Sequence, residues 1–227
     1  MTRTELSKWE QKFRTKVGKI AAVDPGHDLT HVERVVRTAM VLATSVGAQL
    51  EIVIPAAWLH DLVSVEKSTG ARALASTSSA GAAAAFLTEN GYPTELIADV
   101  QHAIMAHSFS AGISPQTIEA KVVQDADRLD ALGAIGIARC FATGAKWNQK
   151  FYDPEDPFAQ RRSTDDHQYT LDHFKAKIFK IVDTLHTPKA RIEGQRRAKF
   201  MWKYLREFGR EIGTQMSRSA EESYSDQ

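Results

Sequence analysis

A histidine followed directly by an aspartate, His60-Asp61, ends an apolar run that extends from Ile52 to Leu59. Such a run is typical of a protein core, where an imidazole and a carboxylate are costly to bury unless a partner satisfies them. A divalent cation is one such partner, because imidazole nitrogen and carboxylate oxygen both bind first-row transition metals. The alternative is that His60 is a hydrogen-bonded core histidine and Asp61 caps a loop. The pair alone does not decide between these interpretations.

Residues with the same chemistry occur before and after this pair. His31 lies near the start of a predicted helix, and three aspartates, Asp125, Asp127 and Asp130, lie at the end of a helix whose earlier part is apolar. Acidic side chains within an otherwise core-facing pattern are unusual and therefore informative. A cation at the His-Asp pair needs further ligands, and these two segments are the places from which we expect them.

Size and composition describe an ordinary globular protein. The chain has 227 residues, of which 43% are hydrophobic and 25% charged, enough for one sizeable core or two small domains. With 29 basic and 28 acidic residues, the net charge is +1, which gives no sign of a nucleic-acid-binding surface. The single cysteine, Cys140, cannot form an internal disulfide, which favours a reducing compartment.

The same features predict a cytoplasmic protein with no membrane partner. The N-terminal residues lack the apolar segment of a signal peptide. No apolar run approaches the roughly 20 residues that a membrane-spanning helix needs. The oligomeric state is open, and a homodimer is one of the states that the sequence allows.

The elements that must position the candidate ligands are predicted to be helices. Apolar residues recur at steps of three or four, and no strand-like alternation, repeat or composition break is found. We expect a single all-α domain, a helical bundle, over residues 1–213, followed by a disordered polar tail over residues 214–227. Polar segments at 64–78 and 144–166 are predicted loops that form the walls of a binding pocket. The predicted helices cover residues 6–22, 28–46, 51–63, 80–87, 93–105, 114–143, 169–185 and 188–212.

The order of the ligand candidates, His31, then His60-Asp61, then Asp127, resembles that of the HD superfamily of metal-dependent phosphohydrolases. The likeness extends over roughly residues 5–210. Within the superfamily, the sequence resembles the small bacterial HD hydrolases of the YedJ and YpgQ type. The stretches that carry it are GHDLTHVERV, AAWLHD, AHSFS, VQDADRLDALGAIGIAR and LDHFKAKI.

The resemblance implies that His31, His60, Asp61 and Asp127 hold one divalent cation, with Mn, Co, Ni, Fe, Zn and Mg all open. Two carboxylates would cancel the charge of the cation and leave positions for water and a phosphate oxygen. The cation would lower the pKa of the attacking water and offset charge on the phosphoryl group. Asp61 is predicted to act catalytically as well, because its proximity would let it orient or deprotonate that water.

His102 and His107 lie between the His-Asp pair and the last ligand, where HD proteins with two metals have extra ligands. Five residues of helix turn two side chains by about 140°, so both would face one site only if the helix ended between them. The sequence after His107 predicts such an end. We therefore interpret His107 as a phosphate contact or proton donor beside a single metal site.

Phosphate binding needs further positive groups, although each candidate could equally be a solvated surface charge. Stringent-response HD hydrolases carry a Glu-Asp pair shortly after the His-Asp pair, and its absence here argues against that substrate and leaves the general acid open among Glu66, His107 and Asp130. The candidates for substrate binding are Arg34, Lys67, Arg128, His173 and Lys177.

The resemblance predicts an enzyme that hydrolyses a small-molecule phosphate ester or phosphoanhydride, with nucleotides as the leading substrates. It does not separate a nucleotide phosphatase from a pyrophosphohydrolase. The alternative is a non-catalytic sensor of HD fold that binds a nucleotide or a metal.

Overall fold

The computed structural model describes residues 1–20, 28–63, 71–108 and 111–215, with the side chains of residues 71–73 also left aside. Every regular element in these ranges is helical, apart from an isolated bridge between Lys150 and Tyr169, which confirms the predicted all-α class. None of the helices in these ranges is long and apolar enough to cross a membrane. Two compact units emerge, one of residues 1–130 with 186–190 and one of residues 131–185 with the chain from Arg191 onward. The single domain over 1–213 stays a prediction.

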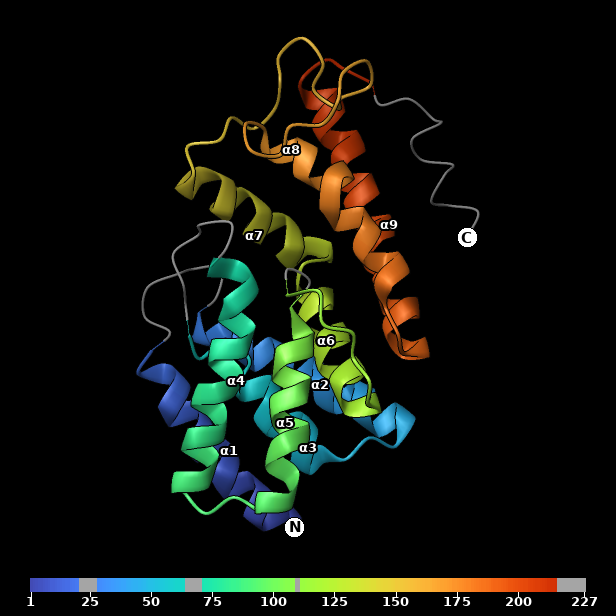
Figure 1. Cartoon of the computed structure of the whole chain (residues 1–227). Coiled ribbons are helices and arrows are strands. Elements are labelled where there is room, and N and C mark those ends of the chain that lie inside the picture. Colours follow the sequence, from blue (N-terminus) through green and yellow to red (C-terminus); the bar gives the residue numbers. More distant parts are fainter. Residues whose placement is uncertain (21–27, 64–70, 109–110, 216–227) are drawn as a thin grey trace. The chain divides into compact units, whose positions relative to one another are not determined.

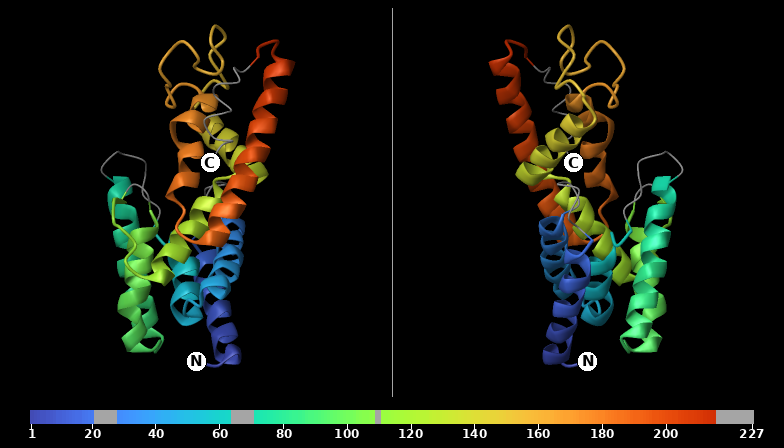
Figure 2. Two further views of the ribbon diagram at one scale, coloured as in Figure 1. Left: turned by 90° about the vertical axis from the view of Figure 1, so that its right-hand side faces the viewer. Right: turned by 90° about the vertical axis from the view of Figure 1, so that its left-hand side faces the viewer.

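The first unit is built around a short helix that is buried almost entirely. Every residue from Ile52 to Leu59 in α3 is buried, and α3 packs against α1, α2, α5 and α6. α4 and α5 lie side by side and run in opposite directions (Figures 1 and 2). The helices of this unit are α1 (Arg3–Gly18), α2 (Leu29–Val46), α3 (Leu50–Leu59), α4 (Ala71–Glu89), α5 (Thr94–His107) and α6 (Ile118–Asp130).

Local signals set the ends of the site-bearing helices. The carboxylate of Asp28 accepts a hydrogen bond from the backbone N–H of His31 at 2.8 Å, as an N-cap does. Gly47 ends α2 in a left-handed conformation with φ 68°, which glycine adopts at little cost. Both ends are as predicted. Buried Glu119 on α6 accepts from the backbone N–H of Gln49 at 3.0 Å, so a side chain of α6 supports the start of α3.

The second unit consists of helical segments and one long irregular stretch. In the irregular stretch, Asp156 accepts backbone hydrogen bonds from Gln160, Arg161 and Arg162, and the guanidinium of Arg162 binds both carboxylate oxygens of buried Asp172. Side-chain acceptors therefore take the place of regular structure here. The segments are α7 (Gly133–Lys146), α8 (Thr170–His173), the π-helix η2 (Phe174–Ile178), the 3-10 helix η3 (Phe179–Thr184) and α9 (Pro188–Glu211), of which residues 188–190 belong to the first unit.

Several predicted helix bounds are wrong. α4 begins at Ala71, so the predicted loop over 64–78 is helical in its second half; its serines and threonines are weak helix formers, but the alanines beside them compensate. α6 begins at Ile118 rather than near Pro115, because the hydroxyl of Thr117 accepts from the backbone N–H of Ala120 and supplies the cap. The helix predicted over 169–185 has nearly the right bounds, but residues 170–184 form it as the succession of α8, η2 and η3.

Candidate metal centre

Four helices of the first unit bring histidine and aspartate side chains to one place. His31 lies in the first turn of α2, and His60-Asp61 directly follows α3. His107 is the last residue of α5, and Asp127 lies in the last turn of α6. The three imidazoles are buried, whereas the side chains of Asp61 and Asp127 are 29% and 27% exposed to solvent. The cluster is therefore closed on its histidine side and open on its carboxylate side.

Distances within this cluster suit a shared cation. His31 Nε2 lies 3.5 Å from Asp127 Oδ1, and His60 Nε2 lies 3.4 Å from Asp61 Oδ2. Ligand atoms of His31, His60 and Asp127 all lie within 4.8 Å of one another, as do those of His60, Asp61 and His107. Ligands about 2.0–2.2 Å from a transition metal lie at such separations from each other. The two groups share His60, so its ring is the centre of the cluster.

Hydrogen bonds at Nδ1 show which nitrogen of each ring faces the cluster. His60 Nδ1 lies 2.8 Å from the backbone oxygen of Ala57, and His107 Nδ1 lies 2.6 Å from that of Ile104. A carbonyl only accepts, so Nδ1 carries the proton, and Nε2 of a neutral ring presents a lone pair. Among the described residues, His60 Nε2 has no hydrogen-bond partner although it is buried. A cation would satisfy this atom.

Charge within the cluster supports the same conclusion. Burial lowers the pKa of His60 and favours its neutral, ligand form. Burial by itself would raise the pKa of Asp127, but the neighbouring His60 and His31 outweigh it and hold that pKa below its usual range. Asp127 is therefore ionised near neutral pH. A neutral imidazole at His60 beside an ionised carboxylate at Asp127 is the combination of protonation states that metal binding requires.

The His-Asp pair lies beyond α3, not inside it. A helix over 51–63 was predicted, but α3 ends at Leu59 and His60 forms its C-cap. Helix geometry would separate adjacent side chains by about 100°. His60 keeps helical backbone dihedrals (φ −61°, ψ −33°), and Asp61 Oδ2 nevertheless lies 3.4 Å from His60 Nε2. The length of the imidazole and the rotation of the carboxylate are enough to bring the two side chains of the pair together.

The three aspartates of α6 have three different surroundings. Asp127 faces the cluster, whereas Asp130 Oδ2 lies 2.7 Å from His31 Nδ1. Fully buried Asp125 accepts from the backbone N–H groups of His186 at 2.9 Å and Thr187 at 2.7 Å. The contact of Asp130 with His31 was not predicted from sequence, where Asp130 stood only as a general-acid candidate. Its spacing of three from Asp127, about one helical turn, was the available signal.

The two histidines of α5 separate because the helix continues through His107, so five residues of helix turn their side chains apart by about 140°. His107 reaches the cluster, with Nε2 3.6 Å from Asp61 Oδ1. His102 lies away from it, and its Nε2 accepts a hydrogen bond from the backbone N–H of Gln116 at 2.9 Å. Burial lowers the pKa of His107, but Asp61 and Asp127 oppose that effect and raise it overall.

The residues predicted to bind substrate are not all found together. Arg34 donates to both carboxylate oxygens of Asp130. Arg128 is half-buried beside Asp127, and burial lowers its pKa. Lys67 and Glu66 lie outside the described residues. His173 and Lys177 belong to the second unit, where both contact the carboxylate of Asp166, at 2.9 Å and 2.7 Å respectively.

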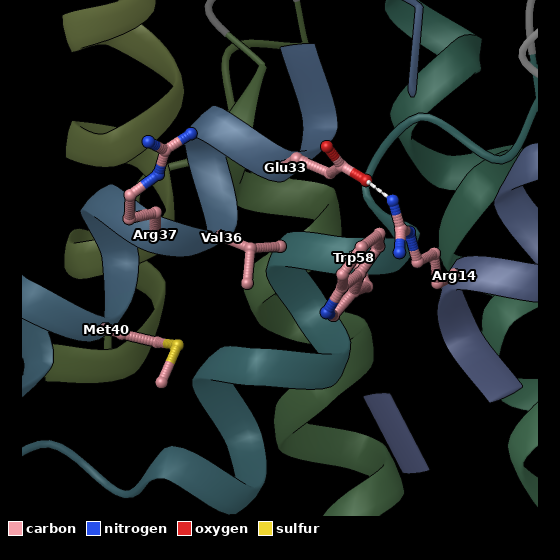
Figure 3. Close-up of a pocket in the computed structure, with 6 residues that line it drawn as sticks. All are labelled: Arg14, Glu33, Val36, Arg37, Met40 and Trp58. Atoms are coloured by element: carbon pink, nitrogen blue, oxygen red, sulfur yellow. Dashed lines mark ion pairs between the residues drawn. The ribbon is translucent and has the colours of Figure 1, made fainter. Parts of the chain in front are cut away.

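A surface hollow of about 380 Å³ is lined by residues of α1, α2 and α3. Figure 3 shows Glu33 and Arg14 turned toward one another there, in an ion pair of 2.7 Å. No predicted site residue lines the hollow, so we do not place the predicted chemistry in it. Its lining residues are Arg14, Glu33, Val36, Arg37, Met40 and Trp58.

Comparison with known proteins agrees with this geometry. The model of the HD domain family matches residues 28–132, which include the whole cluster. The chain is 35% identical over 214 residues to the uncharacterized protein YpgQ of Bacillus subtilis, covering 92% of this chain and 95% of that protein. The chain belongs to the HD domain family. It is a YpgQ-like member of the HD-superfamily hydrolases, whose domains bind divalent metals.

Solved structures of HD relatives share the fold over nearly the whole chain. Bacillus subtilis YpgQ in complex with ADP has a TM-score of 0.68 and 32% identity, covering 89% of this chain and 97% of that one. An HD-superfamily hydrolase of Bacillus thuringiensis has a TM-score of 0.70 and 33% identity, covering 92% and 99%.

Proposed function

We propose that this HD protein is a metal-dependent phosphohydrolase that acts on a nucleotide, at a phosphate ester or phosphoanhydride bond. The observation that carries the proposal is the clustering of His31, His60 and Asp127, whose ligand atoms lie within 4.8 Å of one another around the buried Nε2 of His60, with Asp61 Oδ2 3.4 Å from the same nitrogen. The structure of YpgQ with ADP supports the choice of a nucleotide, since that relative is similar over 89% of this chain.

The four side chains fit a divalent cation and would hold it. Two neutral imidazoles contribute lone pairs, and two carboxylates contribute the negative charge that balances a +2 ion. When bound, such a cation supplies Lewis-acid chemistry, because it makes water more acidic and offsets charge on a phosphoryl oxygen. The partial exposure of Asp61 and Asp127 leaves the carboxylate side accessible to a substrate.

We assign the water-handling role to Asp61. Its Oδ2 faces His60, while its Oδ1 lies 3.6 Å from His107 Nε2. Asp61 thus has one oxygen for the ligand cluster and one beside a second polar group, so it can orient the attacking water or accept its proton. His107 would contact the phosphate or donate a proton to the leaving oxygen. Arg128, next to Asp127 in sequence, is the proposed cationic contact for a substrate phosphate.

A substrate screen tests the proposal. We expect purified protein, loaded in parallel with Mn, Co, Ni or Mg, to release phosphate or pyrophosphate from at least one member of a nucleotide panel. Phosphate release would identify a phosphatase, and pyrophosphate release a pyrophosphohydrolase. Tight binding of a nucleotide that is recovered intact after long incubation would contradict hydrolysis and support the sensor alternative.

A pair of histidine variants tests the ligand assignment separately. His60→Ala should lose most of its bound metal and with it the hydrolysis. His102→Ala, on α5 but away from the cluster, should keep both and is the control. Full metal content and full activity in His60→Ala would show that the ligand set is wrong.

A further inference from the structure

Arg34, Asp130 and His31 form a chain of contacts behind the candidate metal centre. Asp130 is almost completely buried, and its Oδ2 lies 2.7 Å from His31 Nδ1. Arg34 donates from Nε to Asp130 Oδ1 at 2.8 Å and from Nη2 to Oδ2 at 2.9 Å. Both oxygens of Asp130 are therefore engaged, and the planar guanidinium fixes the plane of the carboxylate.

We infer that Asp130 is a positioning residue for His31 and that Arg34 acts through Asp130 by holding its carboxylate in place. The inference rests on the proposed metal site and adds two residues to it. It gives Arg34 a role other than the direct phosphate contact that the sequence suggested.

The pairing of both Asp130 oxygens with the Arg34 guanidinium makes this arrangement directional. A carboxylate only accepts, so the proton of the neutral His31 ring must lie on Nδ1. Nε2 then carries the lone pair, and it faces Asp127 Oδ1 at 3.5 Å, on the side of the cluster. Ring orientation and tautomer are both set by the one contact at Nδ1, which is the usual role of a group behind a metal-binding histidine.

His31 differs from the other two histidines in the partner that it uses. His60 and His107 bond to backbone oxygens of their own helices, three residues earlier. His31 lies in the first turn of α2, where a backbone oxygen three residues earlier belongs to the N-cap, Asp28. A side chain from α6 takes that place instead. The orientation of His31 therefore depends on tertiary structure, and a single substitution can remove it.

Arg34 is well placed to hold the carboxylate of Asp130 still. It lies one turn after His31 on α2, and its Nη1 donates to the hydroxyl of Thr30 at 3.1 Å. Thr30 in turn donates to Asp28 Oδ1 at 2.8 Å. The first turn of α2, its N-cap and the carboxylate behind His31 thus form one network. A lysine could supply the charge of Arg34 but not the two parallel hydrogen bonds.

The test measures metal affinity, without reference to hydrolysis. Mn²⁺ is titrated calorimetrically into metal-free wild-type protein and into the Asp130→Asn and Arg34→Lys variants. We expect Asp130→Asn to bind Mn²⁺ about 10- to 100-fold more weakly, and Arg34→Lys to lose about 3- to 10-fold because it keeps the charge. Matched controls are Glu119→Gln, a buried carboxylate on α6, and Arg37→Lys, an exposed arginine on α2. Both should bind Mn²⁺ as the wild type does.

A spectroscopic readout separates positioning from a general loss of stability. In metal-free protein labelled with ¹⁵N-histidine, two-bond correlations should show His31 protonated at Nδ1 in the wild type and a mixture of tautomers in Asp130→Asn. Wild-type affinity and an unchanged tautomer in Asp130→Asn would overturn the inference. Metal binding without hydrolysis in the wild type would instead contradict the proposed function alone.

Discussion

His107 Nε2 lies 3.6 Å from Asp61 Oδ1, at the edge of the candidate metal centre. Its ring is held from behind by the backbone oxygen of Ile104, 2.6 Å from Nδ1. The same ring lies edge-on to that of His60, with centroids 4.8 Å apart. His107 is therefore held at Nδ1 in the same way as His60, while its Nε2 faces the second carboxylate oxygen of Asp61.

This position predicts that His107 affects turnover more than metal binding. A positioned proton donor contributes about 10²–10⁴ in rate, so His107→Ala should lower kcat at least about 100-fold, with Mn²⁺ affinity within a few-fold of wild type. The measurement is kcat on the best substrate of the panel together with a calorimetric Mn²⁺ titration. His102→Ala should change neither quantity. A loss of Mn²⁺ affinity comparable to that of His60→Ala would show that His107 is a ligand.

The centre of the site could be predicted from sequence because its chemistry is local. His60-Asp61 ends an apolar run, and His31 and Asp127 complete an ordered pattern, of which the structure brings His31, His60 and Asp127 within 4.8 Å of one another. The roles of Asp130 and Asp125 could not be predicted in this way. Each depends on which side of α6 faces α2 or residues 186–187, and sequence spacing does not give the packing of helices.

The helices could be predicted better than their ends. Apolar periodicity identified the helical segments. The caps were read correctly because the carboxylate of Asp28 and the backbone freedom of Gly47 are distinctive signals. The start of α6 was misread because Ser114-Pro115 offers the same signal as the true cap, Thr117. Local propensity does not distinguish two cap candidates three residues apart when tertiary packing decides where the helix begins.

Substitution of Asp125 is predicted to destabilise the protein strongly, although Asp125 has no direct role in the proposed chemistry. Its carboxylate is fully buried and accepts from the backbone N–H groups of His186 and Thr187 and from the hydroxyl of Thr187. Asp125→Ala leaves these donors unsatisfied, and we expect a loss of about 3–5 kcal/mol in the free energy of unfolding. Urea denaturation measures it, with Asp99→Ala on α5 as the control. Equal midpoints for the two variants would show that the contacts contribute little.

The ionisation of Asp166 in the second unit is predicted to make the stability of the protein depend on pH in the acidic range. Burial would raise its pKa, but Lys177 and His173 outweigh that effect and lower it to about 2. Because the folded pKa lies below the unfolded value of about 3.9, the contribution is complete above pH 4 and is lost as the pH falls toward 2. We expect it to be about 1 kcal/mol, since both partners are substantially exposed.

Thermal unfolding of Asp166→Asn and wild type between pH 2 and pH 6 measures this contribution. The difference between the two proteins should be largest above pH 4 and should shrink as the pH approaches 2. Glu89→Gln alters an exposed carboxylate at the end of α4 and is the control. A difference that stays constant over the whole range would show that the carboxylate's charge is not what stabilises the protein.

Substitution by alanine is predicted to change the free energy of unfolding in opposite directions at two helical glycines. An added Cβ at Gly136 in α7 would lie 2.2 Å from the backbone oxygen of Ala131, whereas at Gly81 in α4 it would meet nothing within 4 Å. Backbone cannot swing aside as a side chain can, so Gly136→Ala should lower the free energy of unfolding by about 1–3 kcal/mol. Gly81→Ala should raise it by up to about 1 kcal/mol, because alanine is the better helix former. Urea denaturation of the two variants decides the sign at each position. A stabilised Gly136→Ala would mean that the turn over Ala131 and Leu132 can move away from α7.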